Sequence, residues 1–113
     1  MKHLILIAFI LVGHPALWAS SFHVGVTGSG HPYTQIKTAA AAASPGDTIL
    51  LHAGTYDAQN VGEQINNLHG LPNAWYHILG EPNQIVTLTG GWTEALKLSE
   101  ASYVHISGLR FVN

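Results

Sequence analysis

Residues 43–56 constrain the fold of this chain more than any other stretch, because they place two turns around one short apolar segment. Ser44 precedes a proline, which disfavours helical geometry, so Pro45 and Gly46 end the alanine-rich segment before them. Residues 48–52 are then predicted to form a short strand, and the next two residues turn the chain again. A helix, a tight turn and a short strand in this order, followed by further short strands, predict a coiled parallel sheet and not a compact enzyme domain.

The N-terminal segment has the three-part composition of a secretory signal. A short basic start is followed by an unbroken apolar run over residues 4–12, then by a break and by small residues. About nine apolar residues are too few for the roughly twenty that a membrane-spanning helix needs. We therefore expect residues 1–19 to be a signal peptide, with cleavage after Ser21 as the second choice. Export to the periplasm or the extracellular space follows, with no membrane span after signal removal.

The charge balance excludes one class of partner. The chain has four Lys and Arg residues against six Asp and Glu residues, and one of the four cations, Lys2, lies in the expected signal. A mildly acidic chain without a basic stripe has no electrostatic footprint for nucleic acid. The chain also has no cysteine, so it must be stabilised by its core alone or be part of something larger.

The alanine-rich segment is predicted to form a short helix. Thr34 can cap it, because its hydroxyl can accept a hydrogen bond from an exposed amide in the first turn. The helix is expected to run to about Ala43, with an apolar stripe of small residues at positions 36, 39, 40 and 43. Such a stripe lets a helix lie close against another surface.

Short strands separated by turn residues occupy most of the remaining chain. Residues 58–73 are polar and contain glycines and a proline, which predicts a long loop with at most a short strand near residues 65–68. The expected strands cover residues 22–26, 48–52, 75–80, 85–89, 95–98, 103–108 and 109–112.

Two of these strands match across a fixed offset. The dipeptide His-Ile at residues 77–78 recurs 28 residues later at 105–106, and Gly80 recurs as Gly108. Three short strands separated by tight corners fit within that period, which is typical of one turn of a parallel β-solenoid. An antiparallel sandwich is the alternative, but the chain lacks the Asn-Gly and Asp-Gly turns that favour hairpins.

Alternation along each strand of such a solenoid separates inward from outward side chains. Burial of each large aliphatic side chain would contribute roughly 1.5–3 kcal/mol. The residues expected to point inward are Tyr76, Ile78, Val86, Leu88, Leu96, Leu98, Val104 and Ile106.

Several motifs carry a family resemblance. Ser-Pro-Gly-Asp-Thr-Ile at residues 44–49 and Ala-Gly-Thr-Tyr at 53–56, after Ile-x-x-Ala-Ala at 36–40, resemble the entry into a pectin-lyase-like right-handed parallel β-helix. Residues 75–78 and 102–111 resemble later coils of that superfamily. The resemblance implies that the helix caps one end of the solenoid and that further coils follow. We therefore expect the mature chain, from residue 20 onward, to hold the N-terminal cap and first coils of an incomplete β-helix.

The resemblance also implies a class of function. Lyases of this superfamily cleave acidic polysaccharides by β-elimination, with calcium or basic side chains neutralising the uronate carboxylate. Their catalytic residues usually lie on later coils, so none is carried over to this sequence, and calcium is implied only for a complete protein. We expect an exported protein that binds or degrades polysaccharide. The alternatives are a non-catalytic glycan-binding, adhesion or structural module, and a remnant without activity.

Three residues are candidates for substrate binding. His77 and His105 alternate with inward aliphatic residues, so both should face outward on adjacent coils. Trp75 lies nearby as a stacking platform for a sugar ring. Two histidines without a third ligand make a weak metal site, so no metal is assigned.

Asp47 could be a catalytic or calcium-binding carboxylate, but a residue in a Pro-Gly-Asp turn more often satisfies nearby backbone amides. Gly25, Gly28 and Gly30 resemble a dinucleotide-binding loop, but Tyr33 stands where the third glycine should be. No catalytic residue or nucleotide site is therefore assigned here.

The remaining charged residues are expected at solvated positions. Glu81, Glu94 and Glu100 fall at corners, and their spacing does not predict the carboxylate pair that glycoside hydrolysis requires. Lys97 and Arg110 are expected to be isolated surface cations.

Overall fold

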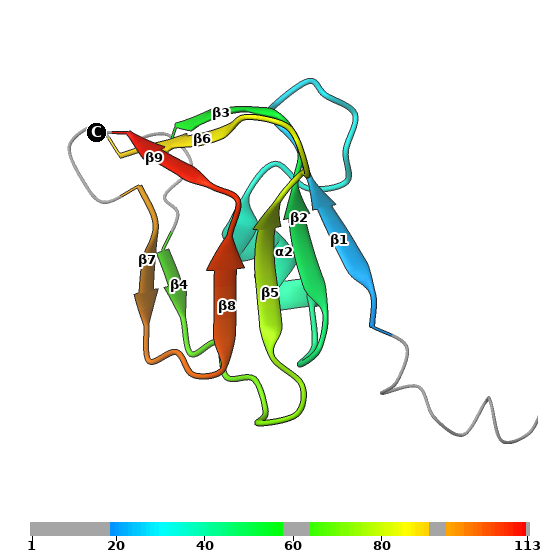
Figure 1. Ribbon diagram of the computed structural model, residues 1–113, viewed down its shortest axis with the longest axis vertical. Helices are drawn as coiled ribbons and strands as arrows, with labels where there is room; N and C mark the ends of the chain where they lie inside the picture. Colours follow the sequence, from blue (N-terminus) through cyan, green and yellow to red (C-terminus); the bar gives the residue numbers. More distant parts are fainter. Residues whose placement is uncertain (1–18, 58–63, 91–94, 113) are drawn as a thin grey trace, which may run out of the picture.

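The computed structural model describes residues 19–57, 64–90 and 95–112. The protein is mainly β in these ranges, with one short helix (Figure 1). The elements are β1 (Ser21–Val24), α2 (Ile36–Ala42), β2 (Thr48–Leu51), β3 (Gly54–Asp57), β4 (Gln64–Asn66), β5 (Tyr76–Gly80), β6 (Val86–Thr89), β7 (Lys97–Ser99), β8 (Val104–Ser107) and β9 (Arg110–Val112). The only described part of the expected signal peptide is Ala19, and no helix in the described ranges is long and apolar enough to cross a membrane.

The strands form three sheets in which every named pair is parallel. Sheet A has the order β1-β2-β5-β8, sheet B the order β3-β6-β9, and sheet C pairs β4 with β7. The chain passes from sheet A to B to C and then returns to A, so that each pass adds one strand beside the preceding one (Figure 1). The parallel sheets of the described residues confirm the predicted strand direction and contradict the antiparallel sandwich.

The 28-residue offset in the sequence is confirmed as a strand register. His77 pairs with His105 and Ile78 with Ile106 across β5 and β8. The recurring glycine has a steric reason, because a Cβ atom at Gly80 would overlap the carbonyl oxygen of Gly108. Neighbouring passes therefore approach each other closely at this corner.

The core lies between the three sheets and is built from side chains stacked in register. Ile49, Ile78 and Ile106 occupy paired positions of sheet A, and Leu88 pairs with Tyr56 in sheet B. All eight residues that the sequence predicts to point inward join this core. Four are buried (Tyr76, Ile78, Val86 and Leu88) and four are partly buried against them (Leu96, Leu98, Val104 and Ile106).

Helix α2 packs against β1, β2 and β4 through its small apolar stripe. Ile36, Ala39 and Ala40 are buried as predicted. The predicted cap is wrong, because Gln35 occupies the N-cap position with extended geometry and no side chain caps the helix. A helix of seven residues is held mainly by burial of its apolar face, so it can begin without a side-chain cap.

Strand β3 is the main element that the sequence-based prediction missed, because residues 53–54 were expected to form a turn. Gly54 instead pairs with Val86, and the ring of Tyr56 is buried beneath sheet B. The Tyr56 hydroxyl donates to the carbonyl oxygen of His52 at 2.6 Å. Burial, together with the charge of Glu81, raises the pKa of Tyr56 to about 12, so this hydroxyl stays neutral at physiological pH.

Other boundaries shift by one or two residues. The strand expected at residues 95–98 is β7, which begins at Lys97, and the strand expected near residues 65–68 is β4. The middle of the expected long loop, residues 58–63, lies outside the described residues.

Asp47 fixes the turn between α2 and β2. Its side chain accepts backbone hydrogen bonds from Ser20 at 2.9 Å and from Ser44 at 2.8 Å. Asp47 is 9% exposed, and both of its carboxylate oxygens accept from amides. The turn role predicted for this residue therefore agrees with its contacts.

We expect Asp47→Ala to lower the free energy of unfolding by about 1–2 kcal/mol, because two amides lose a charged acceptor and only water can replace it. Asp47→Asn retains one acceptor oxygen and should lose about half as much. Urea unfolding of the three proteins measures both effects. Equal stability of Asp47→Ala and the unmodified chain would contradict this role.

Candidate functional site

The outer face of sheet A carries a row of polar side chains in register. Ser21, Thr48, His77 and His105 pair successively across β1, β2, β5 and β8. Their neighbours in each strand point into the core, so alternation directs this row outward. Successive passes therefore place chemically similar groups side by side on one surface.

His77 and His105 lie in direct contact, as the repeat predicts. Their Nδ1 atoms are 3.1 Å apart, and the two rings meet edge to face with centroids 5.3 Å apart. A hydrogen bond between two imidazole nitrogens needs one N–H group and one lone pair, so at least one of the rings is neutral in this contact. The remaining ring nitrogens are available to a ligand as donors or acceptors.

Two exposed aromatic residues lie two positions before the two histidines in the chain. Trp75 and Tyr103 are each 42% exposed, and their ring centroids are 5.7 Å apart. The backbone amide of Tyr76 donates to the Tyr103 carbonyl oxygen at 3.0 Å, so Trp75 and Tyr103 lie close together just before β5 and β8 begin. The indole N–H of Trp75 donates to the Pro72 carbonyl oxygen at 3.2 Å, and this bond orients the ring.

Trp75, His77, Tyr103 and His105 together form what we call the aromatic–histidine patch. Sequence reasoning selected three of its members and missed Tyr103. The sequence contains the pattern that could have identified Tyr103, because the 28-residue offset between the two histidines also relates Trp75 to Tyr103. The patch offers flat apolar ring surface beside groups that exchange hydrogen bonds, a combination suited to ligands with both apolar and hydroxylated faces.

The candidate carboxylates do not converge on this patch. Asp47 is engaged by backbone amides, and Glu81 contacts His52 Nδ1 at 3.4 Å and accepts from the Ala53 amide at 3.1 Å. Glu81 lies in a turn as predicted, but its side chain is only partly solvated because of these two contacts. Glu100 is exposed, and Glu94 lies outside the described residues.

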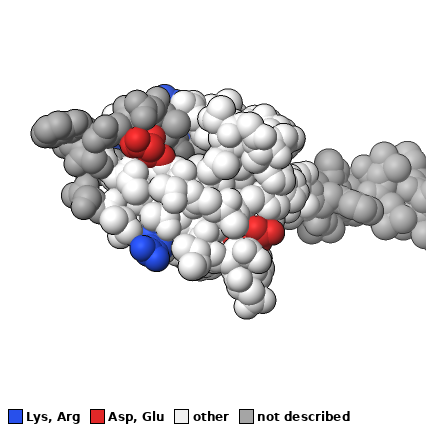
Figure 2. Space-filling view, turned by 90° about the horizontal axis from the view of Figure 1, so that it is seen from above, with Lys and Arg blue, Asp and Glu red and all other residues white. Residues whose placement is uncertain are grey.

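Charge is sparse on the surface. Lys97 and Arg110 are exposed on β7 and β9, as predicted. Figure 2 shows a few charged side chains on one face, separated by uncharged surface. In the described ranges, no group of three or more His, Cys, Asp or Glu side chains is arranged to hold a metal ion.

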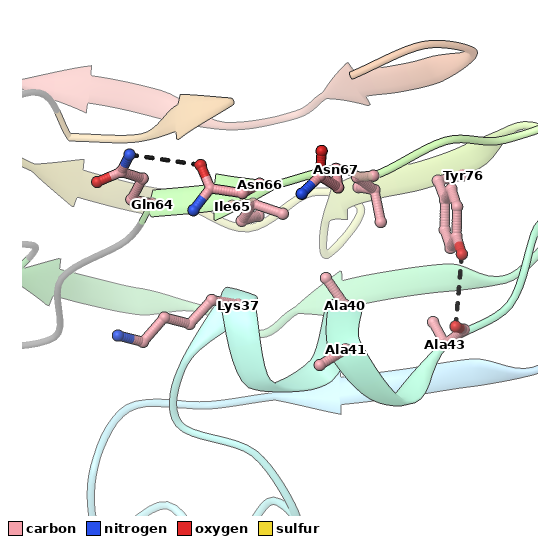
Figure 3. Close-up of a pocket in the computed structure, with 10 residues that line it drawn as sticks. Lys37, Ala40, Ala41, Ala43, Gln64, Ile65, Asn66, Asn67 and Tyr76 are labelled. Carbon is pink, nitrogen blue, oxygen red and sulfur yellow. Dashed lines mark hydrogen bonds between the residues drawn. The ribbon is translucent and has the colours of Figure 1, made fainter. Parts of the chain in front are cut away.

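A separate pocket of about 290 Å³ lies between α2 and β4 (Figure 3). The Tyr76 hydroxyl lies at one end and donates to the Ala43 carbonyl oxygen at 3.4 Å. Burial, and then the charge of Asp47, raises the pKa of Tyr76. At the other end Gln64 donates to the Asn66 side chain at 3.4 Å, where the described chain resumes. We assign no ligand to this pocket.

A scan against protein-family models found no match to this chain, and searches of curated proteins and of solved structures found none either. The family resemblance therefore stays a prediction, and the functional argument depends on the geometry of the site.

Proposed function

We propose that this chain is part of an exported right-handed parallel β-helix that binds polysaccharide through the aromatic–histidine patch. The parallel sheets, in which the chain returns from β2, β3 and β4 to β5, β6 and β7 and then to β8 and β9, support the β-helix. A right-handed sense is expected because nearly all parallel crossover connections have that hand. The position of α2 against β1, β2 and β4 supports its role as a cap.

The observation that carries the binding proposal is that two exposed aromatic rings in mutual contact lie two residues along the chain from two histidines in mutual contact, on adjacent passes. The C–H face of a sugar ring can pack against Trp75 or Tyr103, while its hydroxyl groups exchange hydrogen bonds with the imidazoles. Adjacent parallel strands lie roughly 4.8 Å apart, so a linear saccharide that crosses the two passes just before β5 and β8 would meet both aromatic residues.

The contacts of the described carboxylates favour a binding module over a catalytic one. Asp47 and Glu81 both serve structural contacts. The Asp47 carbonyl oxygen accepts from the His77 amide at 3.1 Å, but the Asp47 carboxylate is engaged by the Ser20 and Ser44 amides. The lyase relationship rests on the sequence resemblance. Incubation of the protein with pectate and with alginate distinguishes a binding module from a lyase, because β-elimination leaves unsaturated sugar ends that absorb ultraviolet light. We expect binding without such absorbance, and a rise in absorbance would identify a lyase instead.

We expect Trp75→Ala and Tyr103→Ala each to weaken saccharide binding about tenfold, because each removes one stacking surface from the centre of the patch. Isothermal titration calorimetry against neutral and uronic-acid oligosaccharides measures the affinity. Phe111→Ala is the matched control, because Phe111 is also an exposed aromatic residue but lies on β9 of sheet B. Failure of the unmodified protein to bind any saccharide, or equal affinity of all three variants, would refute the proposal.

A further inference from the structure

A second histidine cluster lies where the chain leaves sheet A, away from the aromatic–histidine patch. His23 comes from β1, His31 from the loop that follows it, His52 from the end of β2, and Glu81 from the end of β5. Three regions of the chain, at residues 23–31, 52 and 81, thus bring three imidazoles and one carboxylate together. We call these four residues the corner cluster.

His52 is the centre of the corner cluster. Its Nε2 atom is 2.8 Å from His23 Nδ1, and its Nδ1 atom is 3.4 Å from a carboxylate oxygen of Glu81. The ring of His31 stacks on that of His52, with centroids 3.9 Å apart and planes inclined by only 6°. Stacked rings do not aim their nitrogens at a common point, which agrees with the lack of a metal-binding arrangement among the described residues.

These contacts limit how many protons the cluster can hold. The Glu81 carboxylate only accepts, so its contact with His52 favours the tautomer with a hydrogen on Nδ1. With all rings neutral, His23 then donates to the His52 Nε2 lone pair. His52 can take up one proton at Nε2, because His23 Nδ1 can then accept the hydrogen bond from it. The negative charge of Glu81 balances the positive charge of the protonated His52 ring. A second proton on His23 removes that acceptor. A second proton on His31 places two cationic rings face to face.

The corner cluster holds the loop of residues 25–33 in place. The two ends of residues 25–33 are joined by backbone hydrogen bonds from Gly25 to the Tyr33 carbonyl oxygen and from Tyr33 to that of His23. A Cβ atom at Gly25 would overlap the side chains of Ser29 and His31, so the loop is folded closely around the His31 ring. The stack of His31 on His52 therefore ties this loop to the start of the connection between sheets A and B.

We propose that the corner cluster is a proton-operated latch, which holds residues 25–33 against His52 near neutral pH and releases them in acid. The released state can bind more protons than the latched state, so the latch loses stability as the pH falls from neutral into the acid range. Besides the cluster itself, Tyr56 is the titratable group that contacts this corner, through its hydrogen bond to the His52 carbonyl oxygen, and it stays neutral throughout this range.

Hydrogen exchange of the full chain tests the latch. We expect the protection factors of the Gly25, Ser29 and Tyr33 amides, corrected for intrinsic exchange, to fall about tenfold between pH 7.5 and pH 5.0. The Ile78 amide, in the middle of sheet A, should keep its protection. An equal loss at Ile78 would indicate global acid unfolding, and unchanged loop amides would indicate no latch; either result overturns the proposal.

Three variants separate charge from packing. His31→Phe keeps a ring on His52 but cannot be protonated, so it should retain protection at pH 7.5 and lose most of the pH response. Glu81→Gln removes the balancing charge, so the loop should open at a higher pH than in the unmodified chain. His69→Gln is the control, because His69 is exposed and bonds to Ser102 outside the cluster. A full pH response in His31→Phe, or an unshifted midpoint in Glu81→Gln, would overturn the latch.

Discussion

Gly80→Ala is expected to lower the free energy of unfolding by about 3 kcal/mol, at the upper end of overpacking costs. The new Cβ atom would overlap the Gly108 carbonyl oxygen and lie 3.3 Å from a methyl group of Val86. A clash with backbone cannot be relieved by rotating a side chain, so β5 and β8 must separate at this corner. Urea unfolding followed by far-ultraviolet circular dichroism measures the change in stability.

The control for this variant is Ser107→Ala, which adds no atom beside Gly108. The Ser107 side chain is exposed, so this change should stay within about 0.5 kcal/mol of the unmodified chain. If Gly80→Ala were as stable as Ser107→Ala, the close approach of the two passes would be wrong.

Ile78→Ala is expected to cost about 4 kcal/mol, within the range found for removal of a buried isoleucine side chain. Ile78 has no exposed surface and is enclosed in the sheet A ladder between Ile49 and Ile106. The cavity cannot easily collapse, because the strands on both sides are fixed by parallel hydrogen bonding. The loss should appear as a lower urea midpoint with an unchanged slope.

Ile85→Ala makes the same chemical change outside the core. Ile85 is 67% exposed just before β6, so its truncation should cost less than about 0.5 kcal/mol. Similar costs for the two isoleucine variants would mean that the core is not organised as described.

The repeat in the sequence was sufficient to predict the register of sheet A. A His-Ile pair and a glycine recurring after 28 residues place β8 beside β5, and the inward residues follow from alternation. The same rule could have found Tyr103, which repeats Trp75. Tyr103 was missed because the repeat keeps an aromatic residue at this position but changes it from tryptophan to tyrosine.

Features set by contacts between passes were harder to predict. Strand β3 begins at a glycine, a residue depleted in strands, and it is defined by its partner Val86 in the next pass. Thr34 has the right chemistry for a cap, but burial of Ile36 decides where the helix begins. The corner cluster joins His31, in an irregular loop, to a strand end, and no local pattern predicts that contact.

The central claim is that successive passes of the chain lie parallel and in register. Nuclear Overhauser effects in a methyl-labelled sample test it most directly, because Ile78 lies between Ile49 and Ile106. We predict cross peaks from the Ile78 methyl groups to both other isoleucines, together with parallel backbone contacts between β5 and β8. Antiparallel contacts between neighbouring strands, or no cross peak between Ile78 and Ile106, would contradict the account.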